Sequence, residues 1–123
     1  MATFAQQRGA EGEREVVGWL RRNGYLIVAL NWRCGIYEID IVARRGDTLH
    51  IVEVKTRRSG SLTTPEQAVD YRKFRSLRRA AAAFCAQNRR QYGNCELQFD
   101  LAAVEARPDG TFAIRFLENA MGV

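Results

Sequence analysis

The pattern of apolar and polar residues predicts a β-hairpin near the middle of the chain. Residues 38–43 and 51–55 are two β-rich runs, connected through the pair Gly46-Asp47. A two-residue Gly-Asp connection favours a tight turn of the II′ kind, which fixes the register of the two strands. We expect Arg45 to pair with Thr48 across this turn. Counting outward gives the next facing pairs: Val42 with Ile51, Asp40 with Glu53, and Glu38 with Lys55.

The two faces of the predicted hairpin differ in chemistry. One face is purely apolar and carries Ile39, Ile41, Ala43, Val52 and Val54. The other face has a charge cluster at its open end, where the facing carboxylates of Asp40 and Glu53 would have Cβ atoms roughly 4.5–5.5 Å apart. Such carboxylates repel each other unless a proton or a cation intervenes, and Mg²⁺ is commonly held by one or two carboxylates. A surface salt bridge of Lys55 with Glu53 or Glu38 is the simpler alternative.

A helix is expected before the hairpin. Residues 3–23 have helical periodicity, and Glu13 lies on the stripe that faces the core. Gly24 supplies the stop signal. Two glycines one turn apart, Gly9 and Gly12, either permit a close backbone approach or mark an irregular first turn.

The remaining segments predict a second helix and three further strands. Residues 25–30 form a β-rich run, and the loop after it passes through Asn31, Arg33 and Gly35. The segment Thr64-Pro65-Glu66-Gln67 combines a threonine cap, a first-position proline and a glutamine at the box position, so a long helix should begin there. Residues 97–103 alternate as a half-buried strand, and Pro108-Asp109-Gly110 turns the chain into a last strand over 111–117. The order α, three β, α, two β predicts a mixed sheet between helices.

Length and composition fit one soluble globular domain over residues 1–123, with 46% hydrophobic and 27% charged residues. No apolar run approaches transmembrane length, and the N-terminus lacks the apolar segment of a signal peptide, so we expect a cytoplasmic protein without membrane contact. The cysteines lack a Cys-x-x-Cys spacing, which argues against a disulfide framework or a zinc knuckle. The lone His50 is expected to be structural, which argues against a histidine-based triad.

The formal charge of +5 favours a polyanionic partner, and nucleic acid is the leading candidate. Arg57 and Arg58 are expected in a polar, basic and glycine-containing loop, Thr56 to Ser61, that could close over a bound strand. On the second helix, basic residues recur at helical spacing: Arg72, Lys73, Arg75 and Arg79. For both groups, a solvated surface is the alternative to phosphate contact.

The unusual polar residues together form a candidate metal-dependent phosphodiesterase site. Asp40 and Glu53 would ligate Mg²⁺ or Mn²⁺, and Glu13 would complete or adjust the ligand shell. Lys55 would position or activate the attacking water. The ion would neutralise charge that builds on the phosphate, which is Lewis-acid catalysis.

An ordered series of residues carries a family resemblance. Asp40 with Glu53-Val54-Lys55 looks like the core motif of the PD-(D/E)xK nuclease superfamily, and the whole chain resembles the YraN-type family of small bacterial proteins within it. The matching positions are Gly9-x-x-Gly12-Glu13, Asn31-x-Arg33, Glu38-Ile39-Asp40, Val52-Glu53-Val54-Lys55-Thr56-Arg57, Pro65, Lys73, Phe99-Asp100 and Asn119-Ala120.

The resemblance implies a restriction-endonuclease-like α/β core, related to the archaeal Holliday-junction resolvases. The site residues that it implies are Glu13, Asp40, Glu53 and Lys55. Gln67 matches a position where related nucleases often place a polar residue near the site, although helix capping also accounts for it. Two departures leave the proposed ligands in place: Tyr37 stands where the family usually has glycine, and Gln98 where arginine is common. Tyr37 would either crowd the mouth of the site or stack on a base.

The leading functional prediction is a Mg²⁺- or Mn²⁺-dependent endonuclease that hydrolyses DNA, in branched or single-stranded form, during repair or recombination. The alternative is a non-catalytic nucleic-acid-binding or repair subunit that keeps the nuclease scaffold. A third hypothesis is a protein-interaction module in which the charge cluster is only an ion-pair network. DNA against RNA as the substrate, and a homodimer acting on two strands, are questions that the sequence leaves open.

Overall fold

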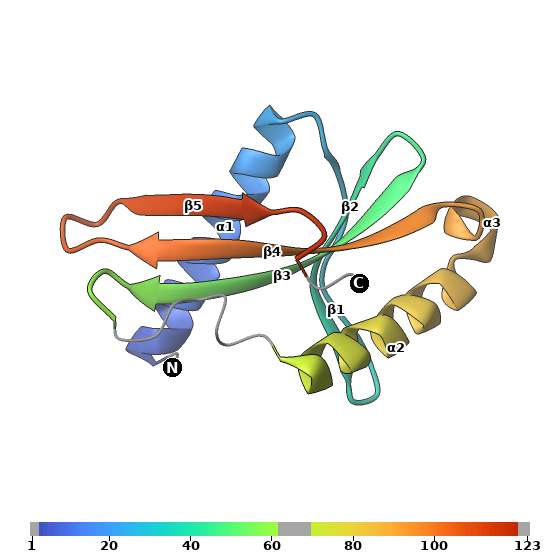
Figure 1. The fold of residues 1–123 in the computed structure, drawn as a ribbon, viewed down its shortest axis with the longest axis horizontal. Coiled ribbons are helices and arrows are strands. Elements are labelled where there is room, and N and C mark those ends of the chain that lie inside the picture. Colours follow the sequence, from blue (N-terminus) through green and yellow to red (C-terminus); the bar gives the residue numbers. More distant parts are fainter. Residues whose placement is uncertain (1–2, 62–69, 121–123) are drawn as a thin grey trace.

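A five-stranded mixed sheet forms the centre of the molecule (Figure 1). The computed structural model describes residues 3–61 and 70–120. The strands follow the order β1-β2-β3-β4-β5, with β3 and β4 parallel and the other neighbours antiparallel. In chain order the elements are α1 (Phe4–Arg22), β1 (Leu26–Cys34), β2 (Tyr37–Arg45), β3 (Thr48–Arg58), α2 (Tyr71–Gln87), α3 (Arg89–Tyr92), β4 (Glu96–Ala106) and β5 (Phe112–Leu117). The predicted αβββαββ order is confirmed, with the short α3 added.

Helix α1 occupies the predicted segment, ends at the predicted stop signal and begins at a capping box that was not predicted. The Thr3 side chain accepts a hydrogen bond from the Gln6 backbone N–H, and the Gln6 side-chain oxygen accepts one from the Thr3 backbone N–H, which completes a capping box. At the other end Gly24 has a φ of 85°, a conformation that favours glycine. No helix among the described residues is long and apolar enough to cross a membrane.

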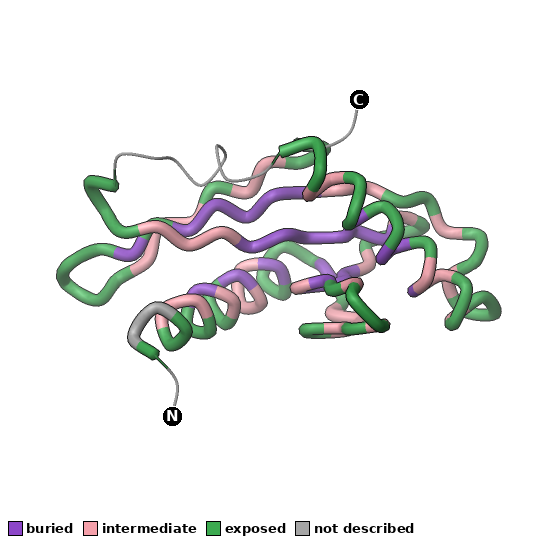
Figure 2. Tube along the Cα trace, turned by 90° about the horizontal axis from the view of Figure 1, so that it is seen from below, coloured by how far each residue is buried: buried purple, intermediate pink, exposed green. Residues whose placement is uncertain are grey.

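The two faces of the sheet bury different apolar clusters, and Figure 2 shows the buried residues concentrated along the central strands. One cluster joins α1 to one face and includes Val16, Leu20, Ile41, Val52 and Val54. The other joins α2 to the opposite face and includes Val42, Leu49, Ile51, Leu77 and Phe84. Alternate residues of β3 therefore point to different helices, as the strand period of two requires. This alternation decides which helix can reach Glu53.

The hairpin of β2 and β3 has the predicted register near its turn. Arg45 pairs with Thr48 and Val42 with Ile51. Gly46 has a φ of 62°, as the first central position of a II′ turn requires. The strand pairing ends at Ile41–Val52, however, so the two predicted outer pairs, Asp40 with Glu53 and Glu38 with Lys55, are not formed. Beyond this point β1 and β2 turn away from β3, β4 and β5 (Figure 1).

One residue of the hairpin lies on the face opposite to the predicted one. Ile39 packs in the α2 cluster, whereas Ile41 packs in the α1 cluster. Regular alternation is interrupted at this level of the sheet: Asn31 in the neighbouring strand β1 has a φ of 49°, and the pairing of β2 with β3 stops at Ile41. A local change of twist thus places Ile39 and Ile41 on different sides.

Three element boundaries also differ from the prediction. Strand β3 continues to Arg58, where a loop from Thr56 was predicted, because its pairing with β4 persists up to Arg58–Ala106. Strand β1 continues through Asn31 and Arg33 to Cys34, where a loop was predicted, because its pairing with β2 persists up to Cys34–Tyr37. Helix α2 begins at Tyr71, because Asp70 has extended backbone angles and its side chain accepts a hydrogen bond from the Lys73 backbone. A continuous helix from Thr64 is therefore wrong; the predicted cap itself, Thr64 to Gln67, lies outside the described residues.

Candidate functional site

Asp40 lies where β2 and β3 separate. Its Oδ2 accepts a hydrogen bond of 2.9 Å from the backbone N–H of Val54. The last regular pair between the two strands is Ile41–Val52, so the carboxylate bridges the strands just past the end of their pairing. A side chain that replaces a backbone acceptor in this way is held in one place. The bond fixes Asp40 beside the segment of β3 that carries Glu53 and Lys55.

Glu53 is a buried carboxylate held by two lysines. Only 4% of its side chain is exposed. Lys55 Nζ lies 3.5 Å and Lys73 Nζ 3.4 Å from the same oxygen, Oε1. Lys55 comes from β3, whereas Lys73 comes from the first turn of α2. A buried carboxylate needs such partners, because an unpaired charge away from water is costly.

Burial raises the pKa of both acids. For Glu53, loss of solvent is the largest cause, and the nearby Asp40 carboxylate raises the pKa further, while Lys73 and Lys55 oppose the rise. For Asp40, loss of solvent again raises the pKa, and the Val54 N–H bond followed by Lys73 opposes it. The two carboxylates therefore share a partly dehydrated space in which an added cation would be favourable.

Glu13 reaches the same charge cluster from α1. Its pKa is raised by burial and then by Asp40, with a smaller contribution from Glu38. A hydrogen bond with the Asn31 side chain acts in the opposite direction. Asp40 is the link between the acids, because its carboxylate raises the pKa of Glu13 and also that of Glu53. The structure thus brings the four predicted residues Glu13, Asp40, Glu53 and Lys55 into one neighbourhood.

In the part of the chain that the structure describes, the candidate site offers a divalent cation two carboxylates, Asp40 and Glu53, and no larger set of protein ligands. Within residues 3–61 and 70–120, no group of three or more His, Cys, Asp or Glu side chains lies close enough together to hold a metal ion. Mg²⁺, however, is commonly held by one or two carboxylates while water and substrate phosphate complete its shell. Asp40 and Glu53 meet that requirement: they are oxygen ligands, half-buried and buried, and burial raises the pKa of each. These two carboxylates are the residues that would hold an ion.

A cavity of about 470 Å³ opens beside the candidate site. Its lining includes Glu13, Val54 and Lys55, and Arg8, Arg57 and Arg58 supply positive charge. Helix α1 lies close to β3 here, because a Cβ added at Gly12 would overlap the Thr56 hydroxyl. Of the two glycines in the predicted close approach, Gly12 makes it, whereas a Cβ on Gly9 would meet nothing within 4 Å.

The predicted nucleic-acid-binding residues separate into three places. Arg57 and Arg58 line the cavity, and Lys73 binds Glu53 inside the site. The exposed Arg75 and Arg79 line a shallow depression on α2 together with Arg78, which was not predicted. Arg72 is exposed on the same helix, and Gln67 lies outside the described residues. Tyr37 packs against the α2 cluster.

Two polar residues near the acids have roles that were not predicted. Lys73 was assigned to phosphate binding from the basic pattern of its helix, which carries no information about its distance from Glu53. Asn31 was placed in a loop, yet it lies in β1, has a φ of 49° and hydrogen-bonds Glu13. Their only sequence signal is membership in the ordered series of family-like positions.

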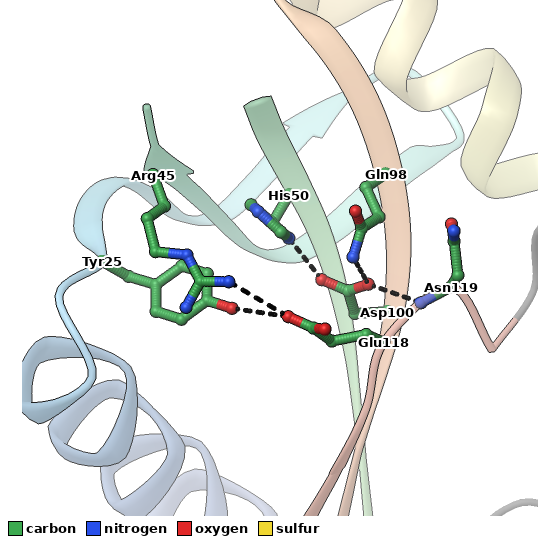
Figure 3. A network of polar contacts seen from close by, with 7 residues as sticks. All are labelled: Tyr25, Arg45, His50, Gln98, Asp100, Glu118 and Asn119. Carbon is green, nitrogen blue, oxygen red and sulfur yellow. Dashed lines mark hydrogen bonds and ion pairs between the residues drawn. The ribbon is translucent and has the colours of Figure 1, made fainter. Parts of the chain in front are cut away.

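A second polar network lies around Asp100 (Figure 3). Asp100 is fully buried, and its Oδ2 lies 2.6 Å from Nδ1 of His50. Its Oδ1 accepts hydrogen bonds of 2.9 Å from the Gln98 side chain and from the Asn119 backbone. None of these residues lines the cavity beside Glu13. Gln98, which stands where the family often has arginine, therefore serves the buried Asp100.

Comparison with solved structures identifies the fold. Hjc, a Holliday junction resolvase from Archaeoglobus fulgidus, matches with a TM-score of 0.52 at 21% identity, covering 90% of this chain and 77% of that one. At this identity the likeness concerns the fold alone. It confirms the predicted restriction-endonuclease-like architecture.

Sequence comparison identifies the family. Residues 12–104 match the uncharacterised protein family UPF0102. The UPF0102 protein of Alkaliphilus oremlandii is 39% identical over 112 residues, which cover 91% of this chain and 95% of that protein. A UPF0102 protein of Porphyromonas gingivalis is 42% identical over 115 residues, covering 92% and 82%. The predicted family resemblance is confirmed, and this chain belongs to the uncharacterised protein family UPF0102.

Proposed function

We propose that this protein is a Mg²⁺- or Mn²⁺-dependent nuclease that hydrolyses phosphodiester bonds of DNA. The observation that carries the proposal is the Asp40–Glu53 pair, placed at a break in the sheet and flanked by Lys55 and Lys73. Charged groups whose pKa values are shifted by burial and by specific partners cluster at functional sites. Glu13 and Lys55 also line a cavity that carries arginines, which fits an anionic substrate.

Each residue of the site has a role that its position supports. Asp40 and Glu53 hold the ion, and Glu13 adjusts the charge around it from α1. When bound, the ion stabilises the charge that builds on the phosphate. Lys55 donates hydrogen bonds from β3 and orients the attacking water, since its ammonium group lies 3.5 Å from Glu53 Oε1.

The basic residues indicate how the substrate lies. Arg57 and Arg58 bind phosphates next to the reacting one, because they line the cavity that Glu13 and Lys55 border. Arg72, Arg75 and Arg79 extend the contact along α2. A resolvase as fold neighbour supports DNA as the substrate, in branched or single-stranded form. We further propose a role in repair or recombination, in the cytoplasm, with a homodimer as the form that acts on two strands.

The test is cleavage of a DNA panel by the purified full-length protein. Duplex, single-stranded, flapped and four-way-junction DNAs are incubated with Mg²⁺, Mn²⁺ or a chelator. We expect metal-dependent cutting of at least one form. Asp40→Asn and Glu53→Gln should each lower the rate by more than the roughly 10–100-fold that loss of an outer-shell partner costs. Glu96→Gln, an exposed carboxylate at the start of β4, is the matched control. An intact panel, or full activity in the two site variants, refutes the proposal.

A second candidate is a DNA-binding subunit without catalysis. It is favoured by one observation: Lys55 and Lys73 already compensate Glu53, so the charge cluster is stable with no ion. In this case DNA binding persists in chelator, weakens with salt, and falls when Arg72, Arg75 and Arg79 are replaced. Glu53→Gln would leave that binding unchanged. Electrophoretic mobility shifts at two salt concentrations separate the two candidates.

A further inference from the structure

Lys73 is joined to the candidate site from outside the sheet. It lies in the first turn of α2, where its backbone N–H donates a 3.0 Å hydrogen bond to the Asp70 cap. The cap fixes where the helix begins, and this start places the Lys73 side chain over the α2 face of β3. Its ammonium group lies 3.4 Å from Glu53 Oε1. The side chain remains 37% exposed, so water reaches one of its sides.

Two lysines from different elements compensate the charge of Glu53. Both lysines contact Oε1 of Glu53, at 3.4 Å for Lys73 and 3.5 Å for Lys55. Lys73 also precedes Lys55 among the groups that hold down the pKa values of Asp40 and Glu53. Glu53 is therefore compensated from two elements, because Lys73 comes from a helix whereas Lys55 shares the strand of Glu53.

A divalent ion and the Lys73 ammonium group compete for one oxygen. Mg²⁺ binds its oxygen ligands at roughly 2.0–2.1 Å and requires near-octahedral geometry. An ion bound there would put two cations, the metal and the Lys73 ammonium group, around Oε1, and the Lys55 ammonium group would be a third. Lys73 is the group that can leave, because it is a flexible four-carbon stem with solvent on one side and no strand constraint. A released lysine is a good point-charge partner for phosphate.

We infer that Lys73 is a positioning residue that occupies the cation place beside Glu53 in the metal-free protein and moves to a substrate phosphate when a divalent ion binds. This inference rests on the proposed function and adds a linkage to it. Lys73 weakens metal binding while DNA is absent. A DNA phosphate that attracts Lys73 relieves this competition, so DNA and metal favour each other's binding. The site thereby holds metal tightly only when substrate is present.

The test measures metal affinity without any cleavage. Mn²⁺ is titrated calorimetrically into the full-length protein at pH 8, without DNA, for the wild type, Lys73→Met, Lys73→Gln and Lys73→Arg. We expect Mn²⁺ to bind at least about tenfold more tightly to the Met and Gln variants, which corresponds to about 1.4 kcal/mol of binding free energy. The Arg variant keeps the charge and should stay near the wild type. Arg78→Met removes one positive charge further along the same helix, and it should change the affinity less than about twofold.

A second measurement follows the linkage. DNA affinity of the wild type is compared in Mn²⁺ and in chelator, on a DNA whose phosphorothioate linkages slow cleavage and at times before product forms. Lys73→Met should lose most of the Mn²⁺-dependent gain. Circular dichroism confirms that each variant is folded. Two neutral variants, Lys73→Met and Lys73→Gln, are used so that the test still stands if one of them does not fold. Equal or weaker Mn²⁺ binding by both neutral variants overturns the inference, as does an absence of Mn²⁺ binding in every variant.

The outcomes separate this inference from the proposed nuclease activity. Wild-type cleavage together with unchanged Mn²⁺ affinity in Lys73→Met and Lys73→Gln removes the role of Lys73 and leaves the nuclease. Tighter Mn²⁺ binding in those variants, with no cleavage of any DNA by the wild type, keeps the role of Lys73 and removes the nuclease.

Discussion

Replacing Asp100 by alanine should destabilise the protein more than most single substitutions. Asp100 is fully buried and touches three partners: His50 at 2.6 Å, the Gln98 side chain at 2.9 Å and the Asn119 backbone at 2.9 Å. Alanine removes the acceptor from all three at once. His50 is itself 3% exposed, so its ring nitrogen would be left without a partner away from water. Figure 3 shows that the partners come from different strands and from the segment after β5.

The size of the effect follows from these contacts. A hydrogen bond to a charged group contributes about 1.5–3 kcal/mol, and breaking a buried pair by removing one partner costs about 3–5 kcal/mol. Because the three contacts share one carboxylate, their contributions do not add fully. We therefore expect Asp100→Ala to lower the free energy of unfolding by about 4 kcal/mol, which is roughly a thousandfold in the folded-to-unfolded ratio. Asp100→Asn keeps the shape and an acceptor oxygen, and should lose about half as much.

Urea unfolding at fixed pH, followed by circular dichroism, measures these changes. The midpoint should fall while the slope stays constant, as expected for altered stability without altered compactness. A double-mutant cycle with His50→Ala should give a coupling energy of at least about 1.5 kcal/mol. Glu105→Ala, an exposed residue of the same strand, is the control and should change stability by less than about 0.5 kcal/mol. A loss under about 1 kcal/mol for Asp100→Ala, or full additivity in the cycle, refutes the reasoning.

Three other substitutions test the packing and the electrostatics. Gly12→Ala should lower the free energy of unfolding in urea by about 1–3 kcal/mol, because its Cβ would overlap the Thr56 hydroxyl. The control Gly9→Ala should cost nothing, and equal losses for the two variants would contradict the close approach. Leu77→Ala should lower the free energy of unfolding by about 2–5 kcal/mol, since Leu77 is 1% exposed. Replacing the exposed Ser76 by alanine should leave stability unchanged, and a small loss for Leu77→Ala would show that α2 packs loosely. Burial raises the pKa of Tyr25 to about 12 from 10.0, so its phenolate absorbance should appear last in an alkaline titration and vanish in Tyr25→Phe. Because the folded pKa is the higher one, the stability that Tyr25 contributes is complete below pH 10 and is lost as the pH rises toward 12; ionisation near 10 would contradict this.

The parts of the fold that local chemistry determines were predictable. The Gly46-Asp47 pair fixed the β2–β3 register, because a two-residue turn with a positive φ leaves little freedom to the flanking strands. Helix α1 was predictable from the helical periodicity of residues 3–23 and from Gly24, which ends it. In each case the signal lies within a few residues of the element that it determines.

The candidate site was predictable only in its composition. The pattern placed Asp40 and Glu53 on one sheet face, but the divergence of the strands past Ile41–Val52 depends on the twist of the whole sheet. The contact between Lys73 and Glu53 depends on where α2 begins. Two capping signals, at Thr64 and at Asp70, competed for that start, and local rules do not rank them. Contacts between elements that are far apart in the chain cannot be predicted from local sequence patterns.

The parallel pairing of β3 with β4 has a consequence for folding. Glu53 faces Leu101 in this register, so the strand that carries the candidate site is completed by a partner formed much later in the chain. Parallel, non-local pairing is slow, because loop closure precedes the contacts that reward it. While the chain grows, β3 has its hairpin partner on one side and an open apolar edge, Leu49 to Val54, on the other. Open edges of this kind invite aggregation, and charged residues within them suppress it. Glu53 interrupts that edge and Lys55 follows it directly, so the charges of the candidate site also protect the unfinished protein.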